Sequence, residues 1–329
     1  MIQWRAPNQS KIQNYWLGIS LVLSYHRLKE NPRALRTFTS LDQSEFETLL
    51  PSFEAAWRAY VYNNQIKKKT RKRRLGGGRK ARLASIEDKL LFILVYFKVY
   101  PLQEVMASMF DMSQGRVNEW IHKLSEVVQS ALGQAQCLPE RDPQNLEQVL
   151  AMCVSVDFMI DGTERPIQRP KDAEQQKEYY SGKKKSHTVK NNLIPDVDER
   201  LVRYLSDTYA GRIHDKKICD EEDYTFPPGC GLFKDTGFQG FEPANVHTYQ
   251  PKKKPKGKEL TPEEKAENKI ISSIRILVEH IISGVKRCRI VKDVFRNTKD
   301  HFADQVMEIA CGLHNFRTKL RYVLSDIQT

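Results

Sequence analysis

SVDFMIDGTERPIQRPKDAEQQKEYYSGKKKSHTVKNN, residues 155–192, is the stretch that decides the fold. Apolar and polar residues alternate over 153–159, and this period of two predicts a strand. We expect the strand to end at Asp161, directly before a glycine, which leaves the carboxylate open to a metal ion or a polyanion. A basic turn at 182–185 then leads into a second predicted strand over 187–194. A carboxylate beside a basic turn suits a phosphate-bearing substrate whose chemistry is done by a bound metal.

The composition describes a basic, globular chain. Its 329 residues suffice for about two or three domains with sizeable cores. Hydrophobic residues make up 40% and charged residues 29%, as in ordinary globular proteins. The net charge of +12 is clustered along the sequence, which favours nucleic acid as a partner. None of the six cysteines forms a C-x-x-C pair, so we predict reduced cytosolic thiols and no zinc site.

An apolar run near the N-terminus, YWLGISLVLSY at 15–25, does not predict a membrane anchor. It is shorter than the ~20 residues that cross a bilayer, and no A-x-A-like cleavage site follows it. We interpret it as a weakly structured extension or a buried helix. The next segment, 23–66, has helical periodicity, with Ser40 as the expected N-cap of a helix over 41–62. Pro51 inside that pattern leaves open whether one kinked helix or two helices form.

A basic segment follows at 67–82, KKKTRKRRLGGGRKAR, in which ten of sixteen residues are Lys or Arg. It has too few apolar residues to form a core, so it is a flexible hinge, an arm along a DNA backbone, or both. The candidate DNA contacts in this basic arm are Lys67, Lys68, Lys69, Arg71, Lys72, Arg73, Arg74, Arg79 and Lys80.

Residues 84–136 predict three helices in a helix-turn-helix layout. Ser85 and Asp88 have the spacing of a capping box at the start of the first helix. A turn ending at Ser113 precedes the third helix, whose polar face is suited to the major groove of DNA. The outward residues proposed to contact DNA are Gln114, Arg116, Asn118 and Lys123. An ordinary three-helix bundle is the alternative interpretation.

Two further acidic residues follow, and the first has a context like that of Asp161. Asp235 comes directly after a predicted short strand and is followed by Thr236-Gly237. Glu279 lies on a helix predicted over 266–287, where Ile270 is counted in the buried face. Ahead of that helix, the Lys- and Pro-rich stretch 251–268 predicts a loop. Three carboxylates are the oxygen ligands that two hard divalent cations need for phosphoryl transfer. A helix is also predicted over 211–222, with Asp215 near its start.

Several of these stretches resemble one family. DGTERPIQRP at 161–170 and YYSGKKKSHTVKN at 179–191 are similar to the catalytic core of bacterial insertion-sequence transposases of the DDE class, insertion-sequence-five type. LFKDTGFQG at 232–240 and RILVEHIISGVKR at 275–287 resemble the same family and occur in the same order. The resemblance extends from about Leu23 to the C-terminus and excludes residues 1–22.

The resemblance implies an α+β multidomain fold in which an all-α helix-turn-helix region precedes an RNase H-like α/β catalytic core with a mixed sheet. The implied division is an extension at 1–22, a helical segment at 23–66, a linker at 67–83, the helix-turn-helix domain at 84–136 and the catalytic domain at 150–329. The implied partner is double-stranded DNA, both element ends and target, bound by a homodimer assembled on that DNA. The implied location is the bacterial cytoplasm, at the nucleoid.

The resemblance also implies the chemistry. Asp161, Asp235 and Glu279 would hold two Mg²⁺ ions, or Mn²⁺, for attack of water on a phosphodiester. The freed 3′-hydroxyl would then attack target DNA. The implied phosphate contacts are Lys183, Lys184, Lys185, His187, Lys190, Arg275 and Lys286. The family has a tyrosine on the late helix where this chain has Ser272.

Each carboxylate taken alone also fits a turn or a surface ion pair. Asp157 competes with Asp161, because both lie on the same face of the predicted strand. Two other functions remain open: a catalytically silent DNA-binding protein, such as a repressor, and a nuclease of the same fold that cuts DNA without joining it.

Overall fold

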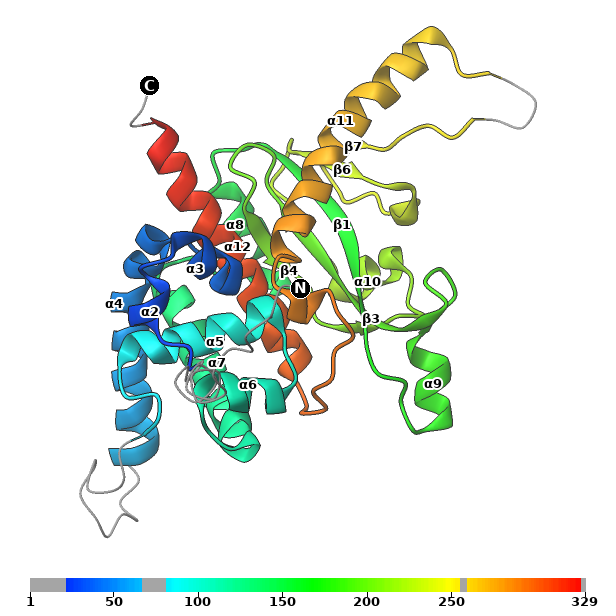
Figure 1. Ribbon diagram of the computed structural model, residues 1–329. Coiled ribbons are helices and arrows are strands. Elements are labelled where there is room, and N and C mark those ends of the chain that lie inside the picture. Colours follow the sequence, from blue (N-terminus) through cyan, green and yellow to red (C-terminus); the bar gives the residue numbers. More distant parts are fainter. Residues whose placement is uncertain (1–21, 67–80, 255–258, 327–329) are drawn as a thin grey trace, which may run out of the picture.

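The computed structural model describes residues 22–66, 81–254 and 259–326 (Figure 1). Residues 67–80 of the basic arm and most of the N-terminal extension therefore lie outside the described residues. None of the helices in these ranges combines the length and the apolar content needed to span a bilayer. The helices of the N-terminal region are α2 (Tyr25–Leu28), α3 (Pro32–Thr39), α4 (Gln43–Val61), η1 (Tyr62–Ile66), α5 (Ile86–Val99), α6 (Gln103–Phe110) and α7 (Gln114–Gln134). Two short helices, η2 (Pro143–Asn145) and α8 (Leu146–Ala151), lead to the sheet.

Helix α4 settles the question raised by Pro51, because it continues through this proline as a single helix. Its N-cap is Asp42 rather than the predicted Ser40. The Asp42 side chain accepts a hydrogen bond from Glu45 N at 2.9 Å, and the Glu45 carboxylate accepts one from Asp42 N at 2.9 Å. Ser40 instead ends α3 in the left-handed conformation, with φ of 63°. A complete capping box satisfies two backbone N–H groups at once, which a single serine does not.

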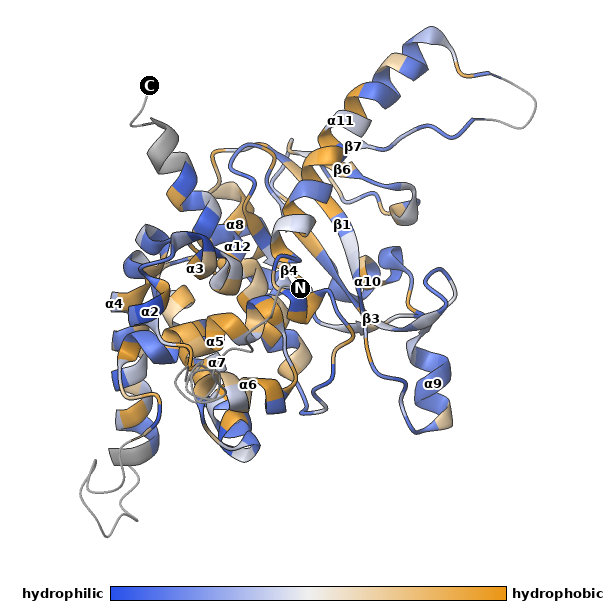
Figure 2. Cartoon of the chain, viewed as in Figure 1, coloured by the Kyte–Doolittle hydropathy of each residue, from blue (hydrophilic) through white to orange (hydrophobic). Residues whose placement is uncertain are grey.

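The three helices α5, α6 and α7 form the predicted helix-turn-helix region. Ser85 caps α5 as expected, accepting a hydrogen bond from Asp88 N at 3.0 Å. Asp111, with φ of 49°, makes the turn that separates α6 from α7. The residues from Leu90 to Phe97 are all buried, because α3, α4 and α7 surround α5 (Figure 2). This helix is therefore the centre of the helical region, and α7 keeps one polar face outside.

The C-terminal region is built on a mixed sheet. Its strands are β1 (Asp157–Pro166), β2 (Tyr180–Ser181), β3 (Ser186–Pro195), β4 (Val202–Leu205), β5 (Tyr209–Ala210), β6 (Gly231–Lys234) and β7 (His247–Tyr249). The path is β2-β3-β1-β6-β7, with β4 and β5 also paired to β3. β1 is antiparallel to β3 and parallel to β6, and β6 is parallel to β7. This arrangement is the predicted RNase H-like core. Its helices are α9 (Ala173–Tyr179), α10 (Asp215–Glu222), η3 (Thr236–Phe238), α11 (Pro262–Val285), η4 (Arg289–Val291) and α12 (Phe302–Asp326).

The limits of the first strand differ from the prediction. β1 begins at Asp157, and Val154 and Val156 are 84% and 70% exposed, so the alternation before Asp157 does not belong to the strand. β1 also continues past Asp161 to Pro166, because β3 pairs with it over this whole length. Asp161 is therefore an interior residue of β1.

Helix α11 also begins earlier than predicted, at Pro262, so residues 262–268 are helical rather than part of a loop. Thr261 caps it in a capping box with Glu264. The first half of α11 projects from the body of the molecule (Figure 1). Ile270 lies in this half and is 62% exposed, which corrects its predicted burial, whereas the neighbouring Ile271 is 8% exposed.

One continuous apolar cluster joins the helical region to the sheet. It runs from Leu28 in α2 to Phe316 in α12 and includes Met159 of β1 and Val278 of α11. Helix α12 contacts α7, α11 and β4, so it lies between the two regions. A second cluster covers the other face of the sheet and includes Phe158 of β1. Since side chains alternate along a strand, Met159 and Asp161 point to the same face, on which α11 packs.

Candidate active site

Asp161 and Asp235 lie side by side where two parallel strands stop pairing. The last paired residues of β1 and β6 are Ile160 and Lys234. The next residue on each strand is an aspartate, and adjacent strands are about 4.8 Å apart. Burial, followed by the charge of Asp235, raises the pKa of Asp161 to about 7. Two acidic groups therefore lie close enough together to affect each other's ionisation.

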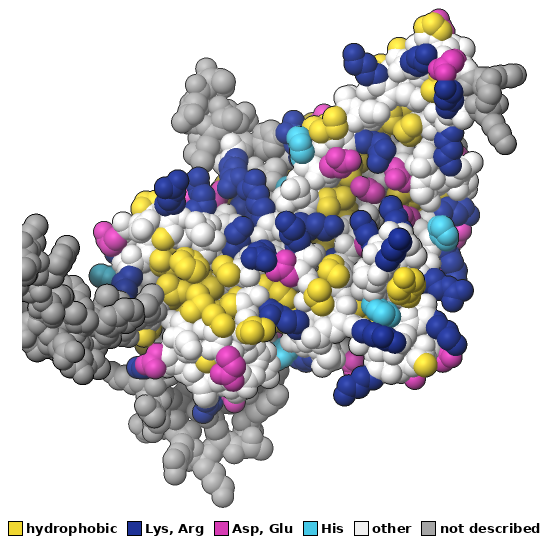
Figure 3. Space-filling model, turned by 45° about the vertical axis from the view of Figure 1, so that its right-hand side comes forward, with side chains coloured by type: hydrophobic (Ala, Val, Ile, Leu, Met, Phe, Trp, Pro, Cys, Tyr) yellow, Lys and Arg dark blue, Asp and Glu magenta, His cyan; other side chains and the backbone are white. Residues whose placement is uncertain are grey.

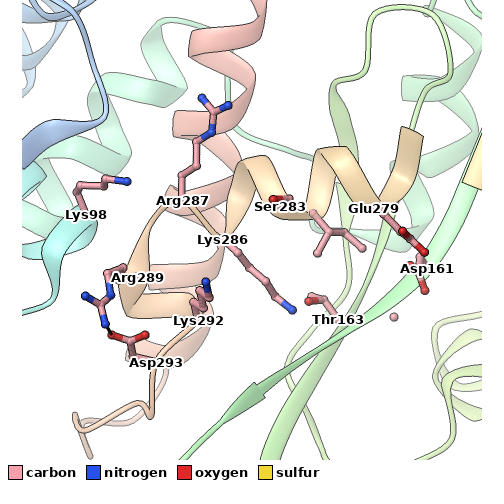
Figure 4. A pocket seen from close by; sticks show the side chains of 12 residues that line it. Lys98, Asp161, Thr163, Glu279, Ser283, Lys286, Arg287, Arg289, Lys292 and Asp293 are labelled. Carbon is pink, nitrogen blue, oxygen red and sulfur yellow. Dashed lines mark ion pairs between the residues drawn. The ribbon is translucent and has the colours of Figure 1, made fainter. Parts of the chain in front are cut away.

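Glu279 reaches the same place from helix α11. Val278 and Ile281 are buried against the sheet, and this packing sets Glu279 over β1. Glu279 and Asp161 both line a pocket of about 700 Å³, in which their carboxylates lie next to each other (Figure 4). The structure thus brings together three acidic residues that are far apart in the sequence.

Two cations on α11 flank Glu279. Arg275, one turn earlier, has Nη2 3.8 Å from Asp235 Oδ2, and its charge lowers the pKa of Asp161. Lys286, at the end of the helix, lines the pocket and donates to the backbone oxygen of Glu164 at 3.4 Å. Burial, and then the nearby Lys184, lowers the pKa of the Lys286 ammonium.

Asp157 lies away from this group of carboxylates. It pairs with Gly231 at the start of β1, four residues before Asp161, which corresponds to about 13 Å along a strand. A Cβ at Gly231 would lie 2.1 Å from Asp157 Oδ1, so this carboxylate rests against the glycine. Asp157 does not line the pocket that contains Asp161 and Glu279.

The carboxylates have the donor chemistry of a divalent-cation site. In residues 22–66, 81–254 and 259–326, no group of three or more His, Cys, Asp or Glu side chains is arranged to hold a metal ion as it stands. Even so, hard cations such as Mg²⁺ prefer carboxylate oxygens. Burial and the charge of Asp235 raise the pKa of Asp161, and a bound cation would favour its ionised form. Asp161, Asp235 and Glu279 therefore offer the ligand atoms that a divalent cation such as Mg²⁺ requires.

Sequence reasoning assigned no role to Asp215, which is the fourth carboxylate here. It begins α10, and its carboxylate lies against both glycines of the aspartate motifs. A Cβ at Gly162 would come within 2.9 Å of Asp215 Oδ1, and one at Gly237 within 3.3 Å of Oδ2. The sequence feature that could have indicated Asp215 is the glycine in each aspartate motif, Gly162 and Gly237. We interpreted the glycines as access for a ligand, whereas the structure uses the space for Asp215.

Lys190 is placed differently from the exposed phosphate contact that we expected. It is 6% exposed, and its ammonium lies 3.1 Å from Asp215 and 3.2 Å from Glu164. Its charge is thus paired with two carboxylates rather than presented to solvent. The more exposed candidates are Lys183, Lys184 and Lys185, which form the turn between β2 and β3. The half-buried His187 packs edge-on against Tyr180, with ring centroids 5.7 Å apart.

The candidate residues of the helix-turn-helix lie together at the surface of α7. Gln103 of α6 links Gln114 and Asn118 through side-chain hydrogen bonds. Arg116 and Lys123 both pair with Glu119, at 2.9 and 3.5 Å. Exposed pairs of this kind contribute little to stability, so these side chains are available to a partner. The nine predicted contacts of the basic arm, from Lys67 to Lys80, lie outside the described residues.

Comparison with known proteins agrees with this geometry. Residues 160–315 match the model of the DDE superfamily endonuclease, and residues 81–134 match that of the helix-turn-helix of DDE superfamily endonuclease. The chain is 27% identical over 270 residues to a protein of Microchaete diplosiphon described as a probable transposase for insertion sequence element IS702. The match covers 80% of this chain and 92% of that protein. No solved structure matches the chain significantly. The chain belongs to the DDE superfamily endonucleases, as a transposase of the bacterial insertion-sequence type with a helix-turn-helix DNA-binding region.

Proposed function

We propose that this transposase binds the terminal inverted repeats of its own insertion sequence, cleaves DNA strands there and joins them to target DNA. The observation that carries the proposal is the meeting of Asp161 and Asp235 at the end of the β1–β6 pair, with Glu279 in the same pocket. The helix-turn-helix packs on the same core as these residues, through α7 and α12. DNA held by α7 is therefore held by the body that carries the carboxylates.

The three carboxylates would hold the divalent cations, Mg²⁺ or Mn²⁺ and two per site. Such ions activate an attacking oxygen and stabilise the leaving oxygen in phosphoryl transfer. Arg275 and Lys286 flank Glu279 and would bind the non-bridging oxygens of the phosphodiester. Lys190 keeps Asp215 directed at the glycines beside Asp161 and Asp235. No protein nucleophile is needed, because water attacks the phosphorus and the 3′-oxygen of the cleaved strand leaves.

The proposal is tested by incubating the purified protein with DNA that carries the ends of its own element. We expect strand cleavage that leaves 3′-hydroxyl groups, and joined products when target DNA is added. Both activities should require Mg²⁺ or Mn²⁺ and disappear with a chelator. Cleavage without joined products would reduce the function to a nuclease, and binding without cleavage would make the protein a repressor. Sizing of the protein–DNA complex tests the proposed homodimer.

Helix α7 is proposed to read the element ends in the major groove. Replacing Arg116 with alanine should relax the preference for terminal-repeat DNA by ~1–3 kcal/mol, the contribution of an arginine that contacts a guanine. The measurement compares dissociation constants for terminal-repeat and unrelated duplexes. Arg58→Ala is the matched control, because Arg58 of α4 is also an exposed arginine in a surface ion pair, with Glu54. An unchanged preference in Arg116→Ala would contradict this role for α7.

A further inference from the structure

Four cations occupy the end of the active-site pocket opposite Asp161 and Glu279. Lys98 comes from α5, Arg287 follows α11, Arg289 belongs to η4, and Lys292 comes directly after it. Figure 4 shows them grouped on the side of the pocket away from Asp161 and Glu279. We call this group the cationic rim. Because α5 belongs to the helical region, the rim spans the junction between that region and the catalytic core.

The positive charge of the cationic rim is largely unpaired. In the part of the chain that the structure describes, Lys98, Arg287 and Lys292 form no ion pair, whereas Arg289 pairs with Asp293 at 2.8 Å. Burial lowers the pKa of the Lys98 ammonium, and the charges of Arg287 and Arg289 lower it further. Lys and Arg side chains also form a band across the middle of the face in Figure 3. Crowded cations without counter-charges create a site for an anion.

The lining of the pocket indicates which anion fits. Among the described residues that line it, the one large apolar side chain is Ile282 and none is aromatic. A nucleotide base is usually held by stacking on an aromatic ring, so this lining does not favour the binding of a free nucleotide. Cations spread along the rim instead match successive phosphates of a polynucleotide backbone, which carries no sequence information.

We propose that the cationic rim binds the backbone phosphates of the DNA strand whose scissile phosphodiester lies at Asp161, Asp235 and Glu279. The inference rests on the proposed function and adds the path of the strand. From the carboxylates, the strand passes along Lys286 and then between α5 and the α11–η4 connection. Contact with Lys98 and Arg287 together links the helical region to the reacting strand.

The test measures DNA binding by the full-length protein with a chelator present, so that metal-dependent cleavage plays no part. The probe is a short fluorescein-labelled duplex of arbitrary sequence, titrated at several salt concentrations. Arg287 and Lys292 are both exposed, so the double variant Arg287→Gln/Lys292→Gln should fold like the parent. Each phosphate contact contributes about 0.9 to the slope of log affinity against log salt. We expect the slope to fall by about two and the affinity at low salt to fall ~tenfold or more.

The matched control is Arg33→Gln/Lys171→Gln, which removes the same charge from two exposed cations outside the pocket. It should keep the slope and the affinity of the parent, and Arg287→Lys/Lys292→Arg should restore both. A parental slope in Arg287→Gln/Lys292→Gln would overturn the inference. Displacement of the duplex by inorganic phosphate at equal phosphate concentration would also overturn it, because the rim would then be a small-anion site. Since binding is read without cleavage, this result stands apart from whether the protein cuts its element ends.

Discussion

Replacing Asp161 or Asp235 with asparagine, or Glu279 with glutamine, is expected to abolish DNA strand cleavage and to leave DNA binding intact. Asp161 and Glu279 line one pocket, and Asp235 follows the strand residue that pairs beside Asp161. An amide at any of the three lacks the charge that divalent cations require. Loss of a group that acts in the transition state lowers rates by ~10³-fold or more. Cleavage of labelled element-end DNA in Mg²⁺ measures the first effect, and a mobility shift of the same DNA measures the second.

Asp157→Asn is the control for this prediction. It is the same chemical change on the same strand, at a carboxylate that rests against Gly231 outside the pocket. We expect it to keep most of the cleavage activity. If Asp157→Asn were as inactive as Asp161→Asn, or if Asp161→Asn still cut DNA, the assignment of the site would be wrong.

The second large effect concerns stability, at the junction of the two regions. Asn315 of α12 is 4% exposed, and its amide group donates to the backbone oxygens of Cys137 at 3.0 Å and Val202 at 2.9 Å. Its side-chain oxygen accepts from Val202 N at 2.8 Å. One side chain thus joins the segment after α7, strand β4 and helix α12.

Asn315→Ala should lower the free energy of unfolding by ~3–9 kcal/mol, because three buried backbone groups lose partners at ~1–3 kcal/mol each. That is a large share of the ~5–15 kcal/mol that keeps a typical protein folded. Urea denaturation followed by circular dichroism measures the change. Thr318→Ala is the control on the same helix, since the Thr318 hydroxyl donates to the backbone oxygen of His314 within α12 and, among the described residues, to no other element. Equal stability of Asn315→Ala and the parent would show that Asn315 does not hold the junction.

Local features could be predicted from the sequence because neighbouring residues decide them. The strand predicted over 187–194 corresponds to β3, and Ser85 caps α5 as predicted. The family resemblance carried by the motifs around Asp161, Asp235 and Glu279 also indicated an RNase H-like core, and the structure has the mixed sheet that it implied.

Errors occurred where local pattern and tertiary packing disagree. Val154 continues the alternation of β1 but has no neighbouring strand, so it stays exposed. Ile270 continues the apolar face of α11 but lies on the half of the helix that projects from the body. In both cases the sequence pattern indicates which face of the element could be buried. Whether that face is buried depends on a neighbouring strand or helix that packs on it.

The sequence by itself therefore indicated the main helices and strands in their order, and it proposed three acidic residues for the candidate site. Only the tertiary structure decided what surrounds those residues. It places Asp215 in the space left by Gly162 and Gly237, and it pairs Lys190 with two carboxylates rather than leaving it exposed. It also brings Lys98 of the helical region to the rim of the active-site pocket. The physical reason is that these contacts join residues distant in the chain, and their energies depend on burial and on charges that no local pattern contains.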